Sequence, residues 1–242
     1  MNLESYEAQI NIAHKTLQSK VFECSKKIND NPDDYQSLID LIGISFHSDQ
    51  LDSALEFIEN AFQIYPYSSE LRTAKISTLL KLGHAVEAKN QIFEFIQHYR
   101  KDKNYRKYKD VFLFLSKIAE VVFNDFKLAY RLILISIKEF SDDYRGYLKK
   151  VLIEMYHYGK FNEGRIHLKK LIKKYNHINI VEAYILSYMK DNPKEGLKEL
   201  KKLCLQYSNQ KLPLVYLEYR LKSTFYDKKE TLYFLDKNKE YI

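Results

Sequence analysis

Side chains with catalytic or metal-binding chemistry are few in this sequence and lie apart from one another. The seven histidines are scattered, and one Glu-x-x-His motif joins Glu154 to His157. This spacing places both side chains on one face of a helix. A di-iron helix bundle needs the motif on two helices, together with two further glutamates. Because the second copy is missing, we expect no metal site and no cofactor.

The two cysteines, Cys24 and Cys204, do not indicate catalysis or a disulfide framework. They are far apart in the sequence, and each lies in a half-apolar segment with a helical pattern. Two lone thiols fit a reducing compartment and ordinary core packing. The six glycines are scattered rather than clustered into a phosphate-binding loop. These observations favour a protein that is not an enzyme.

The charge of the chain raises the question of nucleic-acid binding. It has 39 Lys and Arg against 32 Asp and Glu, a net charge of +7. The densest basic run consists of Arg100, Lys101, Lys103, Arg106, Lys107 and Lys109. Tyrosines are interleaved with it, and aromatic rings among cations can stack on bases. RNA or nucleic-acid binding through this basic surface is therefore an alternative function, although an acidic protein partner explains the charge equally well.

The composition predicts long helices. Hydrophobic residues make up 45% of the chain and charged residues 29%, as in an ordinary folded protein. Six glycines and four prolines in 242 residues are few. An all-β fold needs a turn about every 8–12 residues. Helices with short connections need far fewer turn formers, so they fit this composition better.

The segment from Asn31 to Pro66 has the pattern of a helix hairpin. Its first apolar stripe consists of Leu38, Leu41, Ile42 and Phe46. Steps of three and four residues place such a stripe on one helix face. The stripe breaks over 48–50, resumes at Leu51 and ends before Pro66. We therefore predict two antiparallel helices joined by a tight turn.

A small residue recurs shortly after each predicted turn. These residues are Ala54, Ala88, Ala129, Gly164 and Gly196, at spacings of 34, 41, 35 and 32. A small side chain at this position lets the two helices of a pair approach closely. The extra length in the second spacing falls at 101–109, which we interpret as a longer connection and a hinge. A solvated loop or an extended helix is the alternative.

These features resemble the tetratricopeptide repeat family. The matching residues are Leu38, Leu41, Ala54, Ala61 and Pro66 in one repeat, and Gly83 and Ala88 in the next. The match is clearest over residues 35–100 and degenerate elsewhere. The resemblance implies an all-α fold, a right-handed α-solenoid of antiparallel helix pairs.

The domain organisation follows from the same pattern. We expect N-terminal repeats over 1–102, a basic connection or hinge over 103–109, and degenerate repeats with C-terminal capping helices over 110–242. Residues 1–31 should form an earlier, poorly matching repeat. In the closing segment 211–242, we expect Leu232, Phe234 and Leu235 to pack back on the array. Terminal repeats commonly depart from the consensus because one face meets water.

The resemblance also implies a binding groove, because the first helix of each pair lines the concave surface in this family. Carried over residue by residue, its lining is Ile39, Phe46, His47, Leu80, Phe114, Ile118, Lys149, Tyr156, His157, Ile185 and Tyr188. This lining is largely apolar and suits an amphipathic helix or an extended hydrophobic segment. Alternatively, the superhelix is tightly wound and these side chains form its core.

One subgroup of the family holds the acidic tails of heat-shock chaperones with a clamp of Lys, Asn and Arg. The corresponding positions here are Ile39, Gly43, Ala74, Val111 and Leu115. The clamp is absent, so the sequence argues against that role.

We therefore expect a non-catalytic protein–protein interaction scaffold, either an adaptor or a chaperone-like protein, that binds a protein or peptide segment in its groove. The predicted anchors are Phe46, Phe114, Tyr156 and Tyr188. Self-association into a homo-oligomer is a further alternative. No secretory signal is visible, and the most apolar stretch, residues 111–123, is interrupted by charges and too short to span a membrane. We expect a cytoplasmic protein; export by a route that needs no cleavable signal is the alternative.

Overall fold

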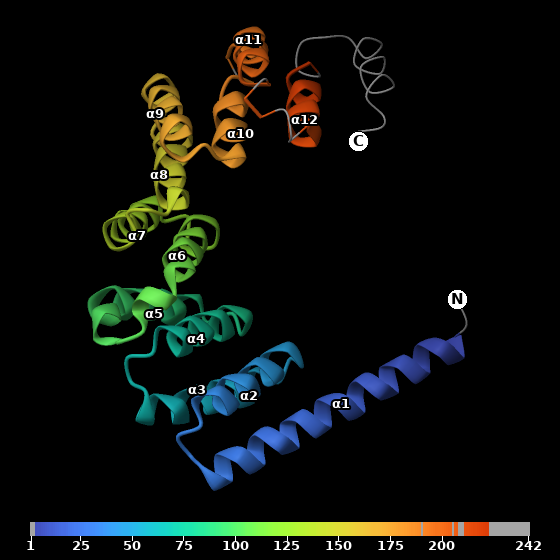
Figure 1. Ribbon diagram of the computed structural model, residues 1–242. Helices are drawn as coiled ribbons and strands as arrows, with labels where there is room; N and C mark the ends of the chain where they lie inside the picture. The colour runs from blue at the N-terminus through green and yellow to red at the C-terminus, as the bar shows by residue number, and fades with distance from the viewer. Residues whose placement is uncertain (1–2, 190, 205, 208–210, 223–242) are drawn as a thin grey trace. The chain divides into compact units, whose positions relative to one another are not determined.

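The computed structural model describes residues 3–189, 191–204, 206–207 and 211–222. Over these residues the chain is helical and has no strand (Figure 1). The α-helices are α1 (Leu3–Asp30), α2 (Tyr35–His47), α3 (Leu51–Ile64), α4 (Ser69–Lys81), α5 (Ala85–His98), α6 (Lys109–Val121), α7 (Phe126–Glu139), α8 (Tyr144–Tyr156), α9 (Phe161–Tyr175), α10 (Ile178–Leu186), α11 (Pro193–Cys204) and α12 (Lys211–Lys222). Successive helices pack in antiparallel pairs, which confirms the predicted all-α solenoid fold.

The chain divides into two compact units, Met1–Leu132 and Ile133–Ile242, which we call the first and second units. The division falls within α7. The predicted hinge at 103–109 is not decided by this division and stays a prediction.

In the first unit, α2 with α3 and α4 with α5 form the two predicted hairpins. Polar caps define where the first helices begin. The Asp34 side chain accepts a hydrogen bond from the amide of Ser37, and the Ser68 side chain accepts one from the amide of Leu71. Each cap satisfies an amide that has no partner within its helix.

The turns inside the helix pairs share a left-handed backbone conformation. The residues concerned are Asp49, Gly83, Asn124 and Gly159, with φ of 61°, 82°, 50° and 71°. Glycine, Asn and Asp tolerate this conformation best. Their spacings of 34, 41 and 35 residues equal those predicted from the small residues, because each repeat has one such turn between its two helices.

The core of the first unit lies between its hairpins. Ala54 and Ala88 are fully buried, as expected for small residues at a close helix contact. The buried Leu38, Ile42, Ile58, Ala61 and Leu71 form one cluster in this core. The apolar residues at steps of three and four, which predicted the helices, are therefore also the residues that are buried in the core.

The connection between α5 and α6 is folded against the hairpins. It contains two short 3₁₀ turns, Tyr99–Lys101 and Tyr105–Lys107. Between them Asp102 is buried, and its carboxylate accepts a 2.8 Å hydrogen bond from the amide of Ser69 at the start of α4. This bond ties the connection to the preceding helix pair.

Residues 3–30 form one continuous helix of 28 residues, where we expected an earlier repeat. The segment has no glycine or proline that would turn the chain back. Near its C-terminal end, Cys24 is buried and Ile28 packs on the core of the first hairpin. Farther from the hairpin, Phe22 is 74% exposed.

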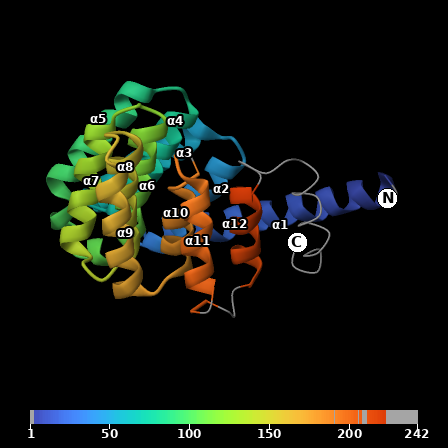
Figure 2. The ribbon, with the colours of Figure 1, turned by 90° about the horizontal axis from the view of Figure 1, so that it is seen from above.

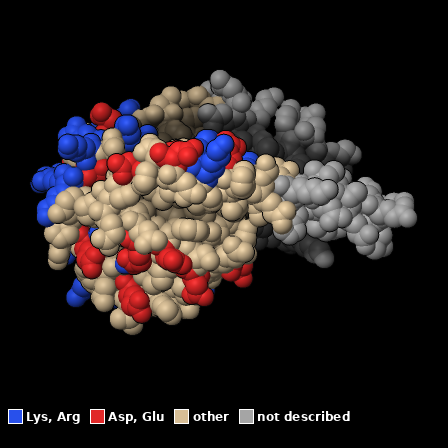
Figure 3. Space-filling view, turned by 90° about the horizontal axis from the view of Figure 1, so that it is seen from below, with Lys and Arg blue, Asp and Glu red and all other residues tan. Residues whose placement is uncertain are grey.

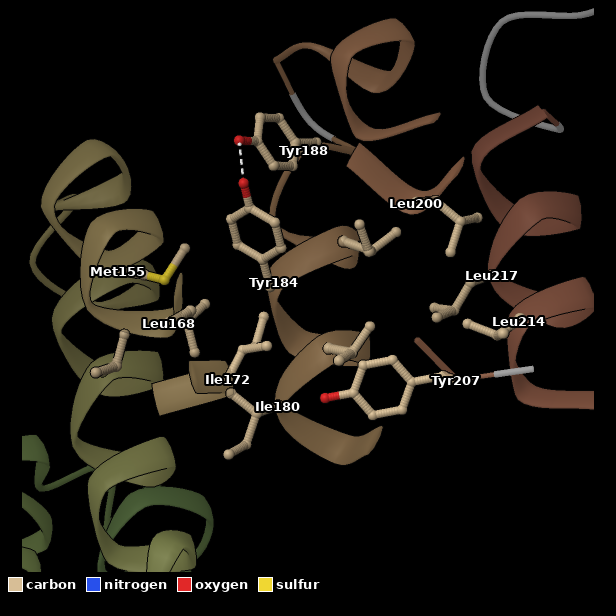
Figure 4. Packing of buried hydrophobic residues seen from close by; sticks show 13 residues of the cluster. Met155, Leu168, Ile172, Ile180, Tyr184, Tyr188, Leu200, Tyr207, Leu214 and Leu217 are labelled. Carbon is tan, nitrogen blue, oxygen red and sulfur yellow. Dashed lines mark hydrogen bonds between the residues drawn. The ribbon is translucent and has the colours of Figure 1, made fainter. Parts of the chain in front are cut away.

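In the second unit, α8 and α9 form a pair, and α10, α11 and α12 pack beside one another (Figure 2). Their shared core includes Met155, Leu168, Tyr184 and Leu217 (Figure 4). Gly164 is buried where α9 crosses α8, and a Cβ atom there would overlap the Met155 side chain. The predicted packing of Leu232, Phe234 and Leu235 lies outside the described residues.

Candidate functional site: an apolar groove in the first unit

A groove lies between α2 and α4, the first helices of two successive pairs. The two helices run in the same direction. At their N-terminal ends, the hydroxyls of Tyr35 and Ser68 lie 2.7 Å apart. At their C-terminal ends, the Lys81 ammonium donates to the carbonyl of Phe46 at 3.1 Å. The groove therefore has two distinct ends, each closed by a contact between the helices.

The groove has a volume of about 300 Å³. Its walls are Ile39, Ile42, Gly43 and Phe46 of α2, Glu70, Thr73, Ala74, Ser77 and Thr78 of α4, and Tyr108 and Val111 at the start of α6. This volume is at the lower end of small-ligand sites, which run from about 300 to about 1,000 Å³. Apolar atoms dominate the walls, so the groove suits apolar side chains.

Two small residues keep the groove open. Gly43 and Ala74 face it from opposite helices, and a Cβ atom on Gly43 would meet nothing within 4 Å. The hydroxyls of Thr73, Ser77 and Thr78 each donate to the carbonyl four residues earlier in α4, at 2.8, 3.0 and 2.9 Å. Because these hydroxyls are satisfied within their own helix, the α4 wall does not need a polar partner.

At the N-terminal end of the groove, Glu70 is the acidic residue of the lining. Its Oε2 accepts hydrogen bonds from the hydroxyls of Tyr35 and Tyr108, both at 3.1 Å. Burial raises the pKa of both tyrosines, and the nearby Glu70 charge raises it further. Both hydroxyls therefore stay protonated and hold the carboxylate in place.

Lys81 lies at the C-terminal end of the groove. The Lys81 ammonium lies 4.8 Å from the centre of the Phe46 ring and 2.9 Å from the Asp49 carboxylate. This cation is already paired, so it adds little net charge to the groove.

Only some of the predicted groove residues of the first unit line the groove. Ile39 and Phe46 line the groove. His47 is exposed beside Phe46, and Phe114 on α6 is 41% exposed. The remaining two do not line it: Leu80 is half-buried and Ile118 is buried. Gly43, Ala74 and Val111 line it, although we considered them only as positions of the missing clamp.

In the second unit, the predicted groove residues separate into exposed and buried ones. Tyr156 is 59% exposed and contacts Phe161 edge-on, His157 is exposed and Lys149 is half-buried. Ile185 and Tyr188 are buried in the core, and Tyr188 is labelled in Figure 4. Their side chains pack between helices, which is the alternative that the sequence left open for the apolar lining.

A polar network covers this core. Glu199 is buried, and its carboxylate accepts hydrogen bonds from Tyr184 at 2.7 Å, Lys202 at 2.6 Å and Lys169 at 2.9 Å. Burial alone would raise the pKa of Glu199, but these three donors together outweigh it and lower the pKa to about 2. Lys169 also lies over the Tyr184 ring. All of these groups are paired internally, so the network stabilises the fold and offers no free catalytic group.

The basic surface lies on the connection and the start of α6. Arg100, Lys101, Lys103, Arg106, Lys107 and Lys109 are all exposed. The neighbouring tyrosines are engaged by the protein itself: Tyr99 is buried, Tyr105 packs edge-on against Tyr99, and Tyr108 binds Glu70. On the face shown in Figure 3, most Lys and Arg lie towards the left edge, and Asp and Glu are spread over the whole face.

The described residues contain no group of three or more His, Cys, Asp and Glu that could hold a metal ion. Glu154 accepts a 2.8 Å hydrogen bond from Lys150. Both cysteines are free thiols, and burial raises the pKa of each. Within the described part of the chain, no helix is both long and apolar enough to cross a membrane.

No protein-family model matches the chain, and no curated protein matches it significantly. Solved structures do match. A tetratricopeptide repeat protein from Parabacteroides merdae aligns with 98% of this chain and 93% of its own, at 16% identity and a TM-score of 0.59. The chain has the tetratricopeptide repeat fold.

Two further structures with this tetratricopeptide repeat fold cover most of the chain. YrrB, described as a TPR protein with an unusual peptide-binding site, covers 87% of this chain and 96% of its own, at 15% identity and a TM-score of 0.51. PilF from Pseudomonas aeruginosa covers 85% and 90%, at 13% identity and a TM-score of 0.51. At these identities the comparisons establish the fold alone.

Proposed function

We propose that the protein is a non-catalytic interaction scaffold whose first unit binds a short segment of another protein in the groove between α2 and α4. The observation that carries the proposal is the open, largely apolar groove on the first helices of successive pairs. Peptide binding by YrrB, which has the same fold, supports it.

The dimensions of the groove limit what it can hold. Ile39 and Phe46 mark its length along α2, and seven residues of helix span about 10 Å. An extended chain rises about 3.3 Å per residue, so about three residues fit. We therefore propose that one or two apolar side chains of the partner enter the groove, with Phe46 and Ile39 as the principal contacts. Such small, buried contacts commonly supply most of the binding energy at an interface.

An adaptor and a chaperone-like protein would use this groove differently. An adaptor binds one partner sequence tightly, whereas a chaperone-like protein accepts many apolar segments weakly. The walls of the groove belong to packed helices and are held by contacts at both ends. This preorganised shape favours a specific partner, and we propose the adaptor.

The proposal can be tested by filling the groove without disturbing the core. Gly43→Met would place a flexible apolar side chain in the open space, since a Cβ atom at Gly43 meets no neighbour. Asn90→Met, on an exposed position of α5, is the matched control. Peptides selected from a displayed random dodecapeptide library against the wild-type protein should bind Gly43→Met at least about tenfold more weakly. They should bind Asn90→Met as they bind the wild type.

Equal binding to the wild type and to folded Gly43→Met would overturn the proposal. Circular dichroism of both variants shows whether the helices are intact, so a loss of binding can be separated from a loss of folding. Nucleic-acid binding finds no comparable support, because the tyrosines of the basic surface are held by internal contacts.

A further inference from the structure

We infer that the segment bound in the groove carries a Lys or Arg side chain that pairs with Glu70, next to the apolar side chains that fill the groove. The inference rests on the proposed function and specifies the chemistry of the partner. It makes Glu70 the residue that determines specificity at this site.

Glu70 is held in position by other elements of the first unit. Its Oε2 accepts hydroxyl hydrogen bonds from Tyr35 of α2 and from Tyr108 of the connection before α6. Oε1 has no hydrogen-bond partner among the described residues. Two donors therefore fix the carboxylate within the groove wall while one of its oxygens stays available to a ligand.

The neighbouring cations of α4 pair with acidic residues other than Glu70. The two cations nearest along α4 are already paired, Arg72 with Glu94 at 2.6 Å and Lys75 with Glu59 at 2.6 Å. Glu70 itself forms no ion pair with a Lys or Arg of the described chain. Its hydroxyl donors stabilise the carboxylate but carry no positive charge. A ligand cation would therefore supply the charge that the groove does not.

The surroundings strengthen such a pair. The groove walls near Glu70 are apolar or satisfied within their own helix, as the hydroxyl of Thr73 shows. A charge pair that is partly shielded from water attracts more strongly than one on an open surface. A carboxylate with an oriented free oxygen also accepts a charge-assisted hydrogen bond from Lys or Arg.

The order of groups along the groove sets the order of groups in the partner. Glu70 and Ser77 both line the groove on α4 and are seven residues apart, about 10 Å along the helix. The acidic end and the apolar middle are thus within reach of one extended segment of about three to four residues. In the bound segment, we therefore expect a basic residue directly before or directly after the apolar residues.

The test begins with the same displayed library of random dodecapeptides, selected on the wild-type protein. One selected peptide is then synthesised in three forms that differ only at its basic position: Lys, Gln or Glu. The wild type should bind the Lys form more tightly than the Gln form by on the order of tenfold, and the Glu form most weakly. Glu70→Gln should bind the Lys and Gln forms equally, and Glu70→Lys should prefer the Glu form.

The outcomes separate this inference from the proposed function. If wild type and Glu70→Gln bind the Lys and Gln forms alike, Glu70 does not select a cation, and this inference is overturned while groove binding stands. If the selected peptides contain no enriched basic residue, the inference fails in the same way. If peptides bind Gly43→Met as well as wild type, the groove is not the site and both fail.

Discussion

Replacing Glu199 by Gln should destabilise the second unit at neutral pH and should have no effect in strong acid. The carboxylate is buried, and its pKa falls from an ordinary value of 4.5 to about 2 because Tyr184, Lys169 and Lys202 donate to it. A folded-state pKa below the unfolded one stabilises the fold above about pH 4.5, and this stability disappears as the pH falls towards 2. A shift of about 2.5 units corresponds to about 3 kcal/mol at pH 7, an upper value for the contribution of the charge.

Urea denaturation followed by circular dichroism, at pH 7 and at pH 2.5, measures this difference. Every other carboxylate is shared by the two proteins, so the difference between wild type and Glu199→Gln isolates this one group. The variant should lose about 3 kcal/mol of unfolding free energy at pH 7 and about a quarter of that at pH 2.5. A loss of equal size at both pH values would refute the reasoning, because it would show that the side chain acts through packing and not through its charge.

Two further pairs of substitutions test the fold. Gly164→Ala should lower the unfolding free energy by about 1–3 kcal/mol, because the new methyl group overlaps Met155. Adding Met155→Ala should reduce the cost of Gly164→Ala, because it removes the overlapping side chain. If the double variant loses the sum of the two single losses in denaturation, the close contact is contradicted. Gly83→Ala should lower the unfolding free energy by about 1 kcal/mol, because a φ of 82° disfavours a residue with a side chain. Gly43→Ala should raise the unfolding free energy by at most about 1 kcal/mol, because Gly43 is in a helix and has open space around it. Melting temperatures that change in the same direction in both variants would contradict this distinction.

The helices could be predicted from the sequence because local signals agree with the packing. Apolar residues at steps of three and four mark the buried faces, and the left-handed turns fall on Asp49, Gly83 and Gly159, residue types that tolerate the conformation. The single long helix α1 was missed as such. Its sequence has no glycine or proline, and that absence was the available signal.

The groove could be predicted only in part. Periodicity identifies apolar residues on one face, but it does not separate those that line a groove from those buried between neighbouring helices. Ile39 and Phe46 line the groove, whereas Ile185 and Tyr188, at similar positions in a later repeat, are packed into the core. The difference depends on how later helices cover each position, which is information from distant parts of the chain.

Glu70 was missed for a different reason. It lies about one turn before Thr73 and about two turns before Ser77 on the groove face of α4, so extending that stripe towards the helix start would have included it. What the sequence alone could not show is its contact with Tyr108, 38 residues later, since that contact depends on the fold of the connection.

Methyl-resolved NMR during titration with a library-selected peptide tests the central claim most directly. Groove binding predicts that the methyl signals of Ile39, Ile42 and Val111 shift together and saturate, while the exposed Ile166 in the second unit does not move. Shifts confined to methyl groups of the second unit, with those of the groove unchanged, would contradict the account.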